Sequence, residues 1–151
     1  MNLAPARPAG RSRARQAALQ ALYQWQLTGE EPQHIASQFL TERPMGKADL
    51  DYFKDLLSNI PKQIVALDAA LAHSLDRPLA QVDPVERAIL RIGAYELRSR
   101  PDVPWRTVIT EAVKLAKVFG AEQSYRYINA VLDKLARATT HSGNTAKTLV
   151  D

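Results

Sequence analysis

The side chains best placed to do chemistry in this chain are three arginines within five residues, Arg11, Arg13 and Arg15. A guanidinium group can bind phosphate oxygens through two parallel hydrogen bonds, so arginines at this density favour a polyanionic ligand. Positive charge at the start of a helix also opposes the helix macrodipole, typically by a few tenths of a kcal/mol to about 1 kcal/mol for each exposed residue. Folding alone does not explain this arrangement, and a merely solvated basic end is the alternative.

A second candidate surface lies in the stretch FGAEQSYRYINAVLDKL, residues 119–135. The turn after Gly120 is expected to expose backbone N–H groups. Tyr127 falls about a third of a helical turn away from the inward-facing Ile128. A tyrosine that points outward beside Arg126 could stack on an unpaired nucleic-acid base. An ordinary half-buried surface tyrosine is the alternative, and composition alone does not decide between the two.

The other reactive residue types form no catalytic or metal-binding pattern. The chain has no cysteine, which excludes disulfides and thiolate chemistry. Glu31 and His34 have the Glu-x-x-His spacing of di-iron bundles, but such sites need two of these motifs and further inward carboxylates. Asp49, Asp51 and Asp55 fit the solvated start of a helix better than a metal site. The sequence therefore predicts no enzyme, no metal and no cofactor.

The formal charge of +4 comes from one end of the chain. Four arginines, beginning with Arg7, precede the first acidic residue, Glu30, and the other sixteen basic residues are balanced by sixteen acidic ones. A basic start on a balanced body indicates an anionic partner at one place. Residues 1–10 resemble no signal peptide, and no stretch approaches the roughly 18 apolar residues of a membrane span. We therefore expect a cytoplasmic protein with no membrane partner.

Helices must position these side chains, because apolar residues recur at helical spacing and no alternating run predicts a strand. Arg11 and Arg15 fall on the same stripe as the core-facing Ala18 and Leu22, one or two turns earlier. We expect them to project past the end of the core. The first helix is expected to end at Gly29, and a short helix is expected to start at Pro32. Pro61 is expected to kink or break the next helix, over 49–75.

The clearest helix start lies in the second half, where Asp83, Pro84 and Glu86 have the spacing of a capping box. The helix that follows is apolar almost all round and is expected to be central and buried. Two more helices follow, separated by Gly120. We expect an all-α domain of six to seven helices. Its parts are a flexible basic arm over 1–10, a folded domain over 11–138, and a disordered tail over 139–151.

Four stretches occur in this order: ARQAALQALYQWQL, DYFKDLLSNI, VERAILRIGAYEL and DVPWRTVITEAVKLAKVFGAEQSYRYINAVLDKL. Together they closely resemble the NusB family of bacterial transcription antitermination factors over residues 11–138. The resemblance implies two small helical bundles packed across each other. It also implies binding of single-stranded boxA RNA together with NusE, a ribosomal small-subunit protein. The complex would join elongating RNA polymerase and support read-through of ribosomal RNA operons.

The resemblance assigns RNA contacts to individual residues. The arginine-rich start of the family matches Arg11, Arg13 and Arg15, and its aromatic RNA contact in the last helix matches Tyr127. Gln123 stands where the family commonly has an acidic RNA contact. This departure keeps a hydrogen-bonding side chain but removes a charge, and it puts any base preference read at that position in doubt.

Tyr23 and Glu86 match positions associated with the NusE-facing side of the family, although Glu86 also serves the predicted capping box. The resemblance leaves open whether the free protein forms a homodimer. Two other functions stay open on the sequence. One is a purely protein-binding helical adaptor whose basic end is incidental. The other is the NusB-like domain of an RNA cytosine methyltransferase, which would need a catalytic domain whose motifs do not occur in these 151 residues.

Overall fold

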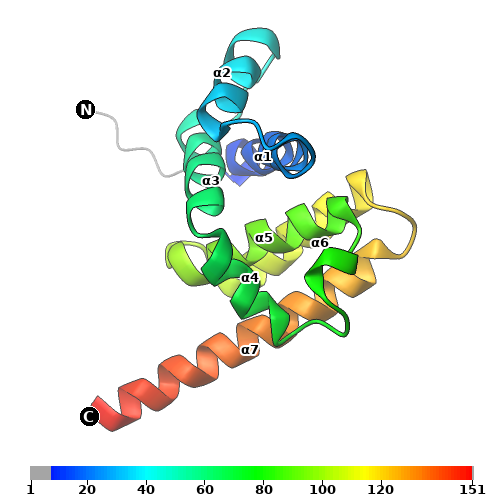
Figure 1. Cartoon of the computed structure of the whole chain (residues 1–151). Coiled ribbons are helices and arrows are strands. Elements are labelled where there is room, and N and C mark those ends of the chain that lie inside the picture. The colour runs from blue at the N-terminus through cyan, green and yellow to red at the C-terminus, as the bar shows by residue number, and fades with distance from the viewer. Residues whose placement is uncertain (1–7, 151) are drawn as a thin grey trace, which may run out of the picture. The chain divides into compact units, whose positions relative to one another are not determined.

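The computed structural model describes the backbone of residues 8–150 and the side chains of residues 8–139. All regular structure in this range is helical, with seven α-helices and one 3-10 turn (Figure 1). The all-α class predicted from the periodicity is therefore confirmed. The chain divides into two compact units, the first reaching Gln63 and the second starting at Ile64.

The first unit contains three helices, α1 (Pro8–Thr28), α2 (Pro32–Glu42) and α3 (Leu50–Lys62). Gly29 ends α1 with a φ of 71°, a conformation that suits glycine. The Asp49 side chain caps α3 by accepting a hydrogen bond from the backbone N–H of Tyr52 at 3.0 Å. The predicted break near Pro61 is confirmed, because α3 ends one residue after this proline.

The core of the first unit forms where α1, α2 and α3 pack against one another. The rings of Phe39 and Phe53 lie 5.9 Å apart at its centre. A hydrogen bond of 2.9 Å from the Asp49 N–H to the Gly10 carbonyl joins the start of α3 to the first turn of α1. This bond helps to fix the basic end of α1 on the core. The other fully buried large side chains of the unit are Leu19, Leu22, Ile35, Leu56, Leu57 and Ile60.

The second unit packs α4 (Ile64–Ala72), α6 (Trp105–Phe119) and α7 (Ser124–Val150) around α5 (Pro84–Ser99), after a short 3-10 turn, η1 (Leu79–Gln81). The Asp83 carboxylate accepts hydrogen bonds from the N–H groups of Val85 and Glu86, at 3.0 and 3.2 Å. The predicted start of the central helix is therefore confirmed. At Gly93 an added Cβ would lie 2.7 Å from Leu132 Cδ1, so glycine here lets α5 and α7 approach closely.

The first and last helices extend beyond the limits expected from the sequence. Helix α1 begins at Pro8, inside the segment 1–10 predicted to be a flexible arm, and residues 1–7 lie outside the described residues. Helix α7 continues to Val150, whereas the sequence predicted a helix end at 138 and a disordered tail. The segment after residue 138 contains no proline and a single glycine, so no strong stop signal interrupts the helix.

Candidate nucleic-acid interface

The three arginines of α1 lie in three different environments. Arg13 is exposed. Arg11 is half-buried, with its guanidinium carbon 4.5 Å from the centroid of the Tyr52 ring. Arg15 is only 2% exposed, and its guanidinium carbon lies 5.2 Å from the same ring. The prediction that Arg11 and Arg15 project past the core is therefore wrong for Arg15, because the core of this unit extends along α3 to Tyr52 and covers it.

The start of α1 also changes the electrostatic argument about these arginines. Because the helix begins at Pro8, the first turn ends at Arg11, and Arg13 and Arg15 lie in the second turn. The macrodipole acts mainly within the first turn. The unfavourable interaction between the arginine charges and the macrodipole is therefore smaller than the sequence predicted. Arg13 differs from the other two arginines in its exposure to solvent. Arg13 forms no ion pair with any residue that the structure describes.

Tyr52 is a contributor that the sequence analysis missed. Its side chain is 2% exposed, and its ring lies beneath two guanidinium groups. A cation over an aromatic face is attracted by the ring quadrupole. The residue was overlooked because a tyrosine beside Phe53 in an apolar stripe looks like an ordinary core residue. The signal available was its type, since a buried tyrosine can hold cations as well as pack.

The turn into α7 holds Gln123 in a conformation that is rare for its residue type. Its φ is 73°, and it is the only residue other than glycine with a positive φ among those the structure describes. Such backbone strain often accompanies functional sites. Two hydrogen bonds fix the turn, from the Ser124 N–H to the Ala121 carbonyl at 3.0 Å and from the Arg126 N–H to the Gln123 carbonyl at 3.1 Å. The Gln123 side chain is exposed.

Tyr127 is half-buried and belongs to a small charged cluster. The Arg77 guanidinium carbon lies over its ring, 4.8 Å from the centroid. The Tyr127 hydroxyl donates to Asp76 Oδ1 at 3.5 Å, and Arg77 Nε donates to the same oxygen at 2.9 Å. Asp76 and Arg77, which the sequence analysis did not select, therefore hold the tyrosine from the segment before η1. Part of the ring is already covered by a cation.

The cluster shifts the ionisation of its members. Burial raises the pKa of the Tyr127 hydroxyl above its ordinary value, and the negative charge of Asp76 adds to this shift. The hydrogen bond from Arg77 lowers the pKa of the Asp76 carboxyl. Glu86 lies close enough to raise the pKa of Tyr127 as well. At neutral pH the site therefore presents a neutral phenol beside an ion pair.

The structure groups the predicted site residues by unit. The three arginines and Tyr23 belong to the first unit, where Tyr23 is 37% exposed and lies one turn from Leu27, which is 60% exposed. Gln123, Tyr127 and Glu86 belong to the second unit, and the structure brings Glu86 into the neighbourhood of Tyr127. A predicted NusE contact and a predicted RNA contact therefore lie within electrostatic range of each other.

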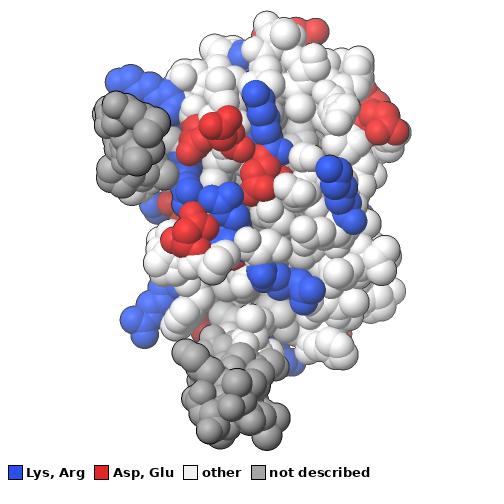
Figure 2. Space-filling model, turned by 90° about the vertical axis from the view of Figure 1, so that its left-hand side faces the viewer, with Lys and Arg blue, Asp and Glu red and all other residues white. Residues whose placement is uncertain are grey.

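The described part of the chain contains few other features that suggest chemistry. Basic and acidic side chains are interspersed on the face drawn in Figure 2, and several Lys and Arg side chains lie next to Asp or Glu. No group of three or more potential metal ligands occurs among the described residues. Within the same range, no helix has the length and apolarity needed to span a membrane.

These observations define a class: a small all-helical protein that offers exposed cationic and aromatic side chains as its candidate binding groups. The sequence model of the NusB family matches residues 12–137. A curated transcription antitermination protein NusB from Alcanivorax borkumensis is 52% identical over 88% of this chain and 89% of its own length. That of Idiomarina loihiensis is 49% identical over 85% of this chain and 92% of its own. The chain belongs to the NusB family.

Solved structures agree with this assignment. The T. maritima NusB structure has a TM-score of 0.74 and 29% identity, and the match covers 84% of this chain and 90% of that one. A crystal structure of the antitermination factors NusB and NusE in complex with double-stranded RNA has a TM-score of 0.73 and 27% identity. This match covers 86% of this chain and 98% of that one.

Proposed function

We propose that this chain binds boxA RNA together with NusE and supports read-through of ribosomal RNA operons by RNA polymerase. The observation that carries the proposal is the similarity to the solved complex of NusB and NusE with RNA, whose matching chain is covered almost completely. The identity of about half to curated antitermination proteins supports the same function. The chain would act by binding rather than by catalysis, in the cytoplasm where transcription takes place.

The three arginines of α1 are expected to contribute unequally to phosphate binding. Arg13 is exposed and has no ion pair among the described residues, so it is the first candidate for a phosphate contact. Arg11 is half-buried against Tyr52 and can reach a phosphate with part of its guanidinium. Arg15 is covered. Arg15 supports the start of α1 by packing on Tyr52, and we assign it a positioning role in RNA binding.

Gln123 and Tyr127 are the proposed base contacts. The exposed amide of Gln123 can donate to and accept from a base edge. Tyr127 offers the part of its ring that Arg77 leaves open, and a guanidinium stacked on the ring can itself stack on a base. Stacking requires an unpaired base. We therefore propose single-stranded boxA RNA as the preferred ligand, although the solved relative contains double-stranded RNA.

Tyr23 and Glu86 are the proposed NusE contacts. Tyr23 is exposed beside Leu27, which gives α1 an apolar surface of the kind that protein partners cover. Glu86 lies in the first turn of α5, and its negative charge acts on both Arg77 and Tyr127. NusE bound at Glu86 would therefore lie close to RNA bound at Tyr127.

Fluorescence anisotropy with three labelled RNAs tests this function. The RNAs are a single-stranded boxA sequence, a scrambled strand of the same length and composition, and the boxA duplex. We expect the single-stranded boxA RNA to bind most tightly, and NusE to tighten it further. Equal binding of the scrambled strand would contradict base recognition. If the chain binds NusE but none of the three RNAs, it acts as a protein-binding adaptor and the proposal is overturned.

A further inference from the structure

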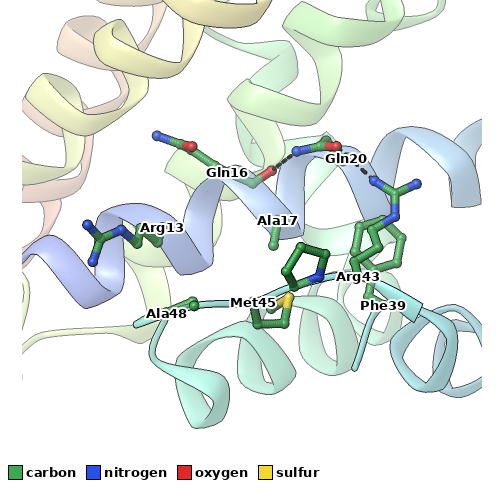
Figure 3. A pocket seen from close by; sticks show the side chains of 10 residues that line it. Arg13, Gln16, Ala17, Gln20, Phe39, Arg43, Met45 and Ala48 are labelled. Carbon is green, nitrogen blue, oxygen red and sulfur yellow. Dashed lines mark hydrogen bonds between the residues drawn. The ribbon is translucent and has the colours of Figure 1, made fainter. Parts of the chain in front are cut away.

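A hollow of about 590 Å³ lies in the first unit, beside the exposed Arg13. One wall is the stretch of α1 from Arg13 to Gln20, and the other is the segment from Phe39 to Ala48 (Figure 3). Arg13 lies at one end of the hollow and Arg43 lies at the other. From Arg13 to Gln20 the α1 wall makes seven residue-to-residue steps, which is about 10 Å of helix. None of the proposed RNA contacts except Arg13 lines this hollow.

Arg43 is held in place before any ligand binds. Its guanidinium carbon lies 4.1 Å from the centroid of the Phe39 ring, and Nη1 donates to Gln20 Oε1 at 2.9 Å. Gln20 is held in turn, since its Nε2 donates to the Gln16 carbonyl at 3.4 Å. Phe39 is fixed in the core at 2% exposure. A guanidinium that is already oriented loses less conformational freedom when it binds an anion.

The charge around the hollow is not neutralised by its neighbours. Arg13, Arg43 and Lys47 make no ion pair with any residue that the structure describes, whereas Arg77, Arg91, Arg100 and Arg137 each bind a carboxylate. Lys47 adjoins the loop wall of the hollow, and its side chain is exposed. The hollow therefore combines unpaired positive charge at both ends with a fixed donor geometry, as a phosphate backbone requires.

The surface between the two arginines suits the rest of a nucleotide. Ala17 and Met45 face each other across the hollow and give it a small apolar floor (Figure 3). Gln16 lines the α1 wall, and its exposed amide points away from the loop wall (Figure 3), so it can donate to and accept from a strand that passes over the α1 edge of the hollow. An acidic peptide would use the charges equally well, and its backbone could also pair with this amide. RNA is favoured because Arg13, already a proposed phosphate contact, forms one end of the hollow.

We propose that this hollow is a second site for single-stranded RNA, in which Arg43 binds a backbone phosphate and the strand runs along α1 toward Arg13. The inference rests on the proposed RNA-binding function and extends it to residues that lie outside the arginines of the α1 start. Gln20 is a positioning residue, because it orients Arg43 through the hydrogen bond to its Nη1.

The test compares Arg43→Gln with Lys54→Gln in the full chain, using anisotropy and a labelled single-stranded boxA RNA. Lys54 is an exposed cation of α3 that does not line the hollow, and it forms no ion pair among the described residues. Both variants lose one positive charge, so general electrostatic attraction changes equally. We expect Arg43→Gln to lower the affinity about tenfold, as the loss of one charge-assisted contact predicts. Lys54→Gln should lower it less than about twofold.

Two further measurements separate a direct contact from a structural effect. Arg43→Lys keeps the charge but loses the fork of donors, so it should restore only part of the affinity while restoring the full salt dependence. RNAs shortened one nucleotide at a time from each end should lose affinity for the wild-type protein at the step that empties the hollow. The same step should leave the affinity of Arg43→Gln unchanged.

The outcomes distinguish the two proposals. If the wild-type protein binds no boxA RNA with or without NusE, the proposed function fails. If the wild-type protein binds RNA and Arg13→Ala weakens it while Arg43→Gln matches Lys54→Gln, the hollow is not an RNA site and this inference is overturned. If Arg43→Gln loses affinity for an acidic peptide but not for RNA, the hollow serves a protein ligand and the inference is equally overturned.

Discussion

Arg13 and Arg15 lie two residues apart on α1 but do different work. Arg13 is exposed, and Arg15 is 2% exposed against Tyr52. We expect Arg15→Ala to lower the free energy of unfolding by about 1–3 kcal/mol, because it removes buried packing and a cation–π contact. Arg13→Ala should change it by less than about 0.5 kcal/mol. Urea denaturation of both variants measures the difference.

The burial of Arg15 also determines how a variant behaves in which all three arginines of the basic start are replaced. A triple alanine variant should melt below the wild-type protein because of Arg15. Equal stability of Arg15→Ala and Arg13→Ala would show that the contact with Tyr52 contributes nothing. RNA affinity should follow the opposite order when it is measured on folded protein, with Arg13→Ala losing more.

Tyr127 offers a separate test of base stacking. Tyr127→Ala should weaken the binding of single-stranded boxA RNA by roughly 1–3 kcal/mol if a base stacks on the ring. The dependence of affinity on salt should stay nearly unchanged, since no charge is lost. Tyr127→Phe is the matched control, because it keeps the ring and loses only the hydrogen bond to Asp76. Similar affinity of the Ala and Phe variants would rule out stacking.

The ionisation of Tyr127 reports on the cluster without RNA. Burial and the charge of Asp76 raise its pKa above the ordinary value of 10.0. A raised pKa means that the contribution of the neutral phenol to stability is complete below the unfolded pKa and is lost as the pH rises through the folded pKa. We expect Asp76→Asn to lower the pKa of Tyr127, as followed by tyrosine-selective NMR. An unchanged pKa would mean that the carboxylate does not act on the phenol.

At the scale of elements, α1 brings the candidate phosphate contacts onto one rigid helix. Arg13 lies on it directly, and Arg43 is joined to it through Gln20. If three or four arginines contact phosphates of single-stranded RNA, log K should fall against log salt with a slope of roughly −2 to −3. Arg13→Ala should reduce the slope by about 0.7. A slope near zero in the wild-type protein would remove α1 from the mechanism.

Helix boundaries were predictable where a residue type determines the backbone. Gly29, Pro32 and Asp83 each mark a boundary that the structure confirms. The end of α7 was missed because its last residues have weak helix propensity but no strong stop signal. The start of α1 at Pro8 was missed because the hydrogen bond from Asp49 to Gly10 comes from residues distant in the chain.

The candidate site was less predictable than the helices, since it depends on contacts between elements. The spacing of Arg15 with Ala18 and Leu22 placed it on the core stripe, but it could not reveal that Tyr52 of α3 covers it. The position of Arg77 over Tyr127 joins residues 50 positions apart in sequence, and the hydrogen bond from Tyr127 to Asp76 joins residues 51 positions apart. Periodicity within one helix carries no information about such pairs.

At the scale of the whole molecule, the two ligands of the proposed function should affect each other. Glu86, a proposed NusE contact, lies within electrostatic range of Arg77 and of Tyr127, a proposed RNA contact that belongs to one cluster with Asp76 and Arg77. A partner that orders this cluster prepares it for the other ligand. Thermodynamic linkage then requires that NusE and RNA tighten each other by the same factor.

The most direct test of the account is the affinity for single-stranded boxA RNA with and without saturating NusE, together with the affinity for NusE with and without saturating RNA. We predict that each ligand strengthens the other by about 1–3 kcal/mol, equally in both directions. Glu86→Gln should reduce this coupling while leaving the affinity for RNA alone within about twofold, because the variant changes no proposed RNA contact. Independent binding of the two ligands, or RNA binding that NusE abolishes, would contradict the account.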